Sequence, residues 1–177
     1  MQARGPLMIE HRLIERMLTA AERQAQRIRE TGLADPEAID LILDFVHTYA
    51  DRTHHGKEED ILFRDLARKP LSPDDQRVMA ELRQEHLDGR QIVRALDGTR
   101  ERHRRGEAEA APELATELQA LTGFYRKHIA KEDQVFFPAA MAYLSDEEQQ
   151  AMLAEFWEFD RKMIHAKYKA VIEALQG

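Results

Sequence analysis

Two segments of the chain carry the same motif: a histidine, a glutamate four residues later, and an apolar triplet that ends in phenylalanine. The motif spans residues 54–63 and again residues 128–137. Residues four apart lie nearly above one another on one face of a helix. The same face carries Leu62 in the first segment and Phe124 just before the second, so we expect it to be buried. Each segment therefore directs an imidazole and a carboxylate toward a helical core.

A shorter motif, glutamate followed by histidine, also occurs twice, at Glu10-His11 and at Glu85-His86. It precedes the longer motif by nearly the same interval in both cases, so the chain is an approximate internal repeat. Each half comprises one helix that presents a Glu-His pair and one helix that presents a His-x-x-x-Glu pair.

Proline and glycine mark the ends of the expected helices. Asp35-Pro36 and Ser72-Pro73 each combine an N-cap residue with a proline suited to the first helical turn. Gly32 is expected to end the first helix as a C-terminal cap. No segment has the pattern of a strand. We expect helices at about residues 7–29, 36–67, 74–104, 112–143 and 146–175.

The short connections between the first four helices favour antiparallel neighbours. The sequence therefore predicts an all-α fold: an up-down-up-down four-helix bundle over about residues 7–143, with an additional C-terminal fifth helix over about residues 146–175. Residues 1–177 are expected to form a single domain, because a chain of 177 residues buries a substantial core without a second one.

The composition excludes several classes of protein. Hydrophobic residues make up 43% and charged residues 33%, a globular balance, and the net charge of −7 argues against a nucleic-acid partner. The absence of cysteine excludes disulfides and iron–sulfur clusters bound through cysteine, and it fits a cytoplasmic protein. Residues 1–8 lack the apolar region of a secretory signal. No stretch approaches the roughly 18 apolar residues of a membrane helix, so no membrane partner is expected.

Histidine and glutamate buried together point to a metal site. A buried carboxylate is costly unless its charge is neutralised, and a metal ion does this directly. Imidazole with carboxylate suits iron, manganese or zinc, and bundles are a known way to hold two such ions. The remaining coordination positions would suit O2 or another small molecule. The symmetry of the repeat predicts these ligands: His11 and His54 for one ion, His86 and His128 for the other, and Glu58 and Glu132 as bridges.

At these residues the chain resembles the hemerythrin-like, or HHE cation-binding, family. The resemblance covers the first four helices, about residues 7–143, and is most specific at residues 54–63 and 127–133. It implies a four-helix bundle with two iron ions per chain, joined by an oxo or hydroxo bridge. It also implies O2 binding, or the sensing and handling of O2, nitric oxide, peroxide or iron. Zinc or manganese remain possible, because the resemblance and not the spacing favours iron.

The chain departs from the oxygen-carrying hemerythrins in two places. Those proteins have a second third-helix histidine four residues from the first, where this chain has Leu82 and Arg90. The second ion is therefore expected to lack one imidazole, which favours enzymatic or sensory use over stable O2 carriage. His165 in the fifth helix is the candidate for the missing ligand. In the fourth helix, Glu132 is expected to face inward in preference to Asp133, unless a π-bulge shifts the register.

Other polar residues near the motifs lie close enough in the sequence to contribute to the site or to point away from it. His55 follows His54 by about 100° around an α-helix, so it is expected to point elsewhere. His47 lies two turns before His54 and is a candidate outer partner of the site. Glu10 and Glu85 either orient the histidine rings or face solvent, and the sequence does not decide between these roles.

Three classes of function remain open on the sequence. The first is a binding or sensing protein that captures O2 or nitric oxide at a di-iron site. The second is a di-iron enzyme that acts on peroxide or nitric oxide, and the third is an iron-storage or iron-sensing protein. In the first two, the expected partner is a small diatomic ligand or peroxide.

Overall fold

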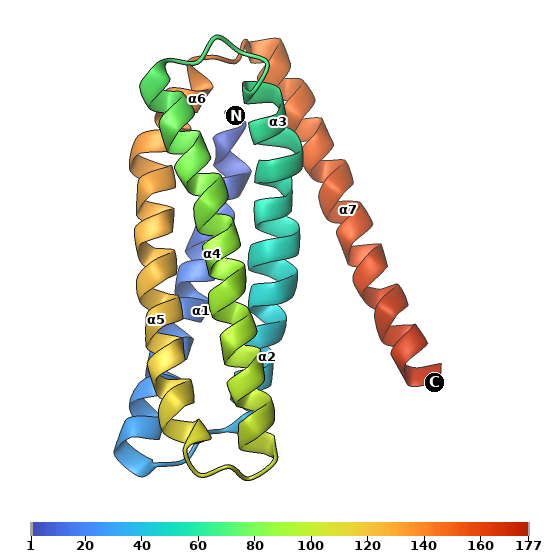
Figure 1. Ribbon diagram of the computed structural model, residues 1–177. Coiled ribbons are helices and arrows are strands. Elements are labelled where there is room, and N and C mark those ends of the chain that lie inside the picture. The colour runs from blue at the N-terminus through green and yellow to red at the C-terminus, as the bar shows by residue number, and fades with distance from the viewer. Residues whose placement is uncertain (1, 177) are drawn as a thin grey trace.

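The computed structural model describes residues 2–176, apart from the side chains of residues 168 and 170–176. All regular structure in that range is helical, with four columns side by side and a fifth helix that leaves them at an angle (Figure 1). The elements are α1 (Arg4–Thr31), α2 (Pro36–Phe45), η1 (Val46–His55), η2 (Glu58–Leu62), α3 (Phe63–Leu66), α4 (Pro73–Arg104), α5 (Ala110–Lys131), η3 (Glu132–Phe136), α6 (Phe137–Met141) and α7 (Asp146–Gln176).

The columns form an antiparallel bundle. The second column is the continuous run from α2 to α3, and the fourth is the run from α5 to α6. Helix α5 packs against both α1 and α4, while α2 packs against the same two helices. Consecutive columns run in opposite directions (Figure 1). The predicted all-α, up-down-up-down bundle with an additional C-terminal helix is thus confirmed.

The expected capping residues set the helix ends. Asp35 Oδ1 accepts a hydrogen bond from the N–H of Glu37 at 3.2 Å, and Ser72 Oγ accepts one from the N–H of Asp75 at 3.1 Å. Caps of this kind typically stabilise a helix by about 1 kcal/mol. Gly32 ends α1 with a φ of 72°, a conformation that glycine adopts without the penalty of a Cβ atom.

Three stretches of the second and fourth columns are π-helical, with wider turns than an α-helix. They are η1, η2 and η3, and all lie at the level of the repeated motif, since η1 ends at His55, η2 begins at Glu58 and η3 begins at Glu132. π-Helical turns are rare and often occur at functional sites. The sequence pattern predicted none of them, because apolar spacing reports which face is buried and not the width of a turn.

Two apolar clusters fill the bundle, one on each side of the motif along its axis. They shield the level of the motif from water in both directions, so polar groups there must find partners within the protein. The cluster toward the connection of α1 to α2 includes Leu18, Ile42, Leu96 and Leu118, and the cluster toward the opposite end includes Leu7, Phe63, Leu66 and Phe137.

Helix α7 docks on the bundle through its N-terminal half and then diverges from it (Figure 1). Met152 and Phe156 are buried in the second apolar cluster and Phe159 packs against it, whereas Trp157 is 78% exposed. The docked part of α7 contacts η1 and η2. Within residues 2–176, no helix combines the length and the apolar character needed to cross a membrane.

Candidate metal centre

The four columns pack so that the six ligands predicted from the sequence meet inside the bundle. None is more than 2% exposed. They come from every column: His11 from α1, His54 and Glu58 from the second, His86 from α4, and His128 and Glu132 from the fourth.

A first group of candidate ligands consists of His11, His54, Glu58 and Glu132, whose ligand atoms lie within 4.8 Å of one another. His11 Nε2 is 2.9 Å from His54 Nε2 and 3.1 Å from Glu132 Oε2. His54 Nε2 is 3.8 Å from Glu58 Oε1. Two ligands of one ion are up to about 4.4 Å apart when each bond is roughly 2.2 Å long. The spacing of this group is therefore close to that of a single metal site.

A second group, within the same limit of 4.8 Å, consists of His55, Glu58, His86 and His128. His86 Nε2 is 3.4 Å from Glu58 Oε2 and 3.8 Å from Glu132 Oε1. His128 Nε2 is 3.2 Å from the same oxygen of Glu132. The second group lies against the first and provides three imidazoles.

The two carboxylates lie between the groups and direct different oxygens to each. Glu58 turns Oε1 toward His54 and Oε2 toward His86. Glu132 likewise turns Oε2 toward the first group and Oε1 toward the second. This is the arrangement expected of carboxylates that bridge two ions.

The expectation that His55 points away from the site is wrong. Its ring is 2% exposed and stacks on His86, with centroids 3.9 Å apart. His54 and His55 end η1, where the wider π-helical turn rotates adjacent residues by less than the about 100° of an α-helix. Two consecutive residues can therefore face the two groups. The sequence did contain a signal for this role. The first motif has two consecutive histidines, whereas the second motif has Ile129 at the position equivalent to His55.

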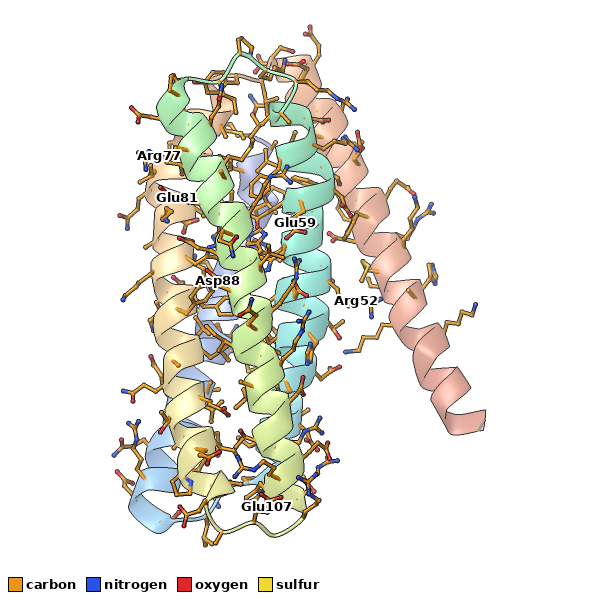
Figure 2. All side chains as sticks on the ribbon, in the orientation of Figure 1. Arg52, Glu59, Arg77, Glu81, Asp88 and Glu107 are labelled. Carbon is orange, nitrogen blue, oxygen red and sulfur yellow. The ribbon has the colours of Figure 1, made fainter. Side chains whose placement is uncertain are left out.

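Each histidine of the two groups has a carboxylate at its Nδ1 atom. Donation from Nδ1 leaves the Nε2 lone pair free for a metal ion and fixes the ring orientation. Glu10 and Glu85 therefore orient the rings of His54 and His128, which decides between the two roles that the sequence left open. Glu59, which contacts His86, lies on the second column opposite α4 (Figure 2). The pairs are His11 with Asp133 at 2.8 Å, His54 with Glu10 at 2.8 Å, His86 with Glu59 at 2.7 Å, His128 with Glu85 at 2.8 Å, and His55 with Asp51 at 3.4 Å.

Several inward-facing atoms of the site are buried without a hydrogen-bond partner. They include both carboxylate oxygens of Glu58 and of Glu132, and Nε2 of His86 and of His128. A buried polar atom without a partner is costly, and unpaired carboxylates are costlier still. Oxygen and nitrogen donors that face one another in this way fit a pair of cations, which would neutralise both carboxylates.

Burial and the nearby carboxylates shift the pKa values of three histidines of the site. Burial opposes protonation of His11, but its hydrogen bond to Asp133 and the nearby carboxylates of Glu132 and Glu58 outweigh it and raise the pKa to about 10. Burial likewise opposes protonation of His86, but the three glutamates around it raise its pKa to about 11. For His55, burial and the neighbouring imidazoles lower the pKa well below its usual value. The two bridging carboxylates thus favour positive charge on the imidazoles of His11 and His86.

Two histidines considered from the sequence lie away from the site. His165, the predicted candidate for a missing ligand, is exposed on α7 and belongs to neither group found among the described residues. His47 Nε2 lies 2.6 Å from Asp97 Oδ2 at the surface, and its side chain is 46% exposed. His47 therefore hydrogen-bonds to Asp97 at the surface and is not an outer partner of the site.

The comparison with protein families agrees with the geometry. The model of the hemerythrin HHE cation-binding domain matches residues 6–140, which include every residue of the two groups. No curated protein matches the chain. The match covers most of the chain, and the buried histidines and glutamates lie where a cation would bind. The chain therefore belongs to the hemerythrin HHE cation-binding domain family.

Proposed function

We propose that this chain holds two iron ions and binds a small molecule, O2 or nitric oxide, at one of them. His11 and His54 would hold the first ion, and His55, His86 and His128 the second, with Glu58 and Glu132 shared between the two. The observation that carries the proposal is the set of buried carboxylate oxygens without hydrogen-bond partners that face imidazole nitrogens.

The two groups offer unequal numbers of ligands. The first has two imidazoles and the second has three, in addition to the shared carboxylates. Two histidines with a carboxylate are the ligand type of non-haem iron sites that keep open positions for O2. We therefore place the small molecule at the ion held by His11 and His54. Iron bound there would supply a reversible electron acceptor or donor for such a ligand.

The surrounding side chains limit what can enter. The Phe137 ring stacks on His11 with centroids 5.6 Å apart, and the Phe63 ring stacks on His86 at 5.7 Å. These rings and the apolar clusters beyond them surround the imidazoles with apolar side chains. A diatomic molecule or peroxide fits this enclosure better than a bulky organic substrate does.

The first experiment is elemental analysis of protein purified without added metal, with visible spectra before and after exposure to air. We expect about two irons per chain, with the absorption of a bridged di-ferric pair. Zinc or manganese in place of iron would correct the metal and keep the site. No metal, and no uptake after anaerobic addition of ferrous iron, would refute the proposal.

The oxygenated spectrum separates the open functions. A stable and reversible charge-transfer band is expected for a binding or sensing protein. Bleaching with consumption of peroxide or nitric oxide would instead identify an enzyme, and unfolding on chelation would indicate an iron-dependent switch. His54→Ala and His128→Ala should each sharply lower the metal content, whereas the matched control His165→Ala should not. Full metal content in the first two variants would contradict the ligand assignment.

A further inference from the structure

A buried lysine connects helix α7 to the candidate metal centre. The side chain of Lys57 is 0% exposed, its Nζ contacts Glu10 Oε1, and the same Nζ lies 2.7 Å from Asp160 Oδ1 of α7. The other oxygen of Glu10 accepts a hydrogen bond from His54 Nδ1 at 2.8 Å. A continuous series of polar contacts therefore runs from α7 through Lys57 and Glu10 to His54.

The second half of the repeat has the same arrangement without α7. Lys131 contacts Glu85 Oε1, and Glu85 Oε2 lies 2.8 Å from His128 Nδ1. The other partner of Lys131 is Glu81 of α4, at 3.2 Å, on the face of α4 toward α5 (Figure 2). The side chain of Lys131 is 30% exposed, so water can solvate it. The two lysines thus occupy equivalent positions, but only Lys57 is buried and depends on a helix outside the bundle.

Glycine at position 56 allows α7 to lie this close. A Cβ atom at Gly56 would come within 2.6 Å of the Phe159 ring of α7. The equivalent residue of the second motif is Ala130. Phe156 of α7 also lies over Lys57, with its ring centroid 6.0 Å from Nζ. The sequence of the first motif is therefore adapted to the docked helix as well as to the site.

The charges indicate what the docked helix does. A buried ammonium ion is strongly destabilising unless carboxylates surround it, and here Glu10 and Asp160 provide them. Glu10 and Asp160 also line a cleft of about 670 Å³ between α7 and the bundle. If Asp160 moved away with α7, Lys57 would be drawn toward water, and the hydrogen bond of Glu10 to His54 would lose its support.

We propose that α7 regulates the retention of the ion held by His11 and His54, with Lys57 as a positioning residue that acts on His54 through Glu10. Asp160 holds Lys57 in place only while α7 is docked. The ion in the second group, supported by Lys131 and Glu81, is independent of α7. The inference rests on the proposed metal-binding function.

The test is the rate at which a chelator removes iron from the full-length, ferrous-loaded protein under anaerobic conditions. Outer partners of metal ligands, here Glu10, typically affect affinity by about 10–100-fold, and Asp160 acts two contacts further out, through Lys57. We expect Asp160→Asn to accelerate release of one ion by about tenfold and to leave the other unchanged. The matched control Glu81→Gln should change the release rate of the ion held by His11 and His54 by less than twofold, because Glu81 contacts Lys131 and not Lys57. Lys57→Met should accelerate release more than Asp160→Asn does. Asp160→Asn is the main test, because Asp160 is 37% exposed and its replacement disturbs folding less than that of the buried Lys57.

The outcomes separate the inference from the proposed function. If wild-type protein takes up two ions but Asp160→Asn releases both at the wild-type rate, α7 has no role in retention. Equal acceleration of both ions, with a lower melting temperature of the metal-free protein, would show that Asp160 is only structural and would also overturn the inference. A wild-type chain that takes up no iron would refute the proposed function itself, and this inference with it.

Discussion

Replacement of His55 by phenylalanine tests the part of the site that the sequence did not predict. His55 stacks on His86, with centroids 3.9 Å apart, and on Tyr125, at 5.9 Å. A phenyl ring can keep both contacts, and a slightly larger ring in a packed core typically costs about 1–3 kcal/mol, less than the total stability of most folded domains. The metal-free variant should therefore fold. It should bind the second ion less tightly than the wild type does, because that group would lose one of its three imidazoles.

The size of the effect follows from linkage between metal binding and folding. Loss of a direct ligand should lower affinity by at least about 100-fold, the upper end of the range for outer partners. A 100-fold loss removes about 2.7 kcal/mol of stabilisation at saturating metal. For a chain of this size, 1 kcal/mol corresponds to roughly 2–4 °C in melting temperature. Added iron should therefore raise the melting temperature of His55→Phe by about 5–11 °C less than that of the wild type.

The assay compares thermal unfolding with and without ferrous iron, together with the number of ions bound per chain. The control is His47→Phe, since His47 lies on the same helical segment, η1, but in a surface pair with Asp97. This control should keep the full stabilisation by metal. If His55→Phe binds two ions and gains as much stability from iron as the wild type, His55 is not a ligand and the reasoning from its position fails.

Further variants test the surroundings of the site and the fold. Glu132→Gln should abolish most metal binding, because it removes the charge of a bridging carboxylate. Asp133→Asn disturbs only the orientation of the His11 ring, so it should weaken metal binding by about 10–100-fold in a metal titration. Asp35→Ala removes the N-cap of α2 and should lower the free energy of unfolding, measured in urea, by about 1 kcal/mol. Tyr143→Phe removes a hydrogen bond to Asp75 and should cost roughly 0.5–1.5 kcal/mol at neutral pH. Hydrogen bonds from Ser72 and Tyr143 lower the pKa of Asp75 below its ordinary value of 3.8. That contribution is present above pH 3.8 and is lost as the pH falls through the lower pKa of the folded state, so wild type and Tyr143→Phe should converge in acid. A difference that stays constant down to low pH would contradict this assignment.

The repeated motif proved to specify more than the inward-facing ligands. Its lysine holds the acid that orients a ligand of the same half, as Lys57 does with Glu10. Its second acid reaches a histidine of the other half: Glu59 meets His86, and Asp133 meets His11. The repetition of these residues was visible in the sequence, but their partners were not, because the partners lie on neighbouring columns.

The sequence by itself determined the features that depend on local chemistry. Helical spacing placed Glu58 on the same face as His54, and cap residues such as Asp35 and Ser72 marked where helices begin. Apolar neighbours then showed that this face is buried. These properties repeat with the period of the helix, so they can be read without knowing which helices are neighbours.

Only the tertiary structure decided the rest. It brought His55 into the site through a π-helical turn, placed His165 on an exposed helix, and buried Lys57 beneath Asp160. None of these depends on the period of an α-helix. The first depends on backbone hydrogen bonds from i to i+5, and the others depend on where α7 docks. A change in turn width or in the docking of one helix moves side chains by several ångströms and leaves the apolar pattern of the sequence unchanged.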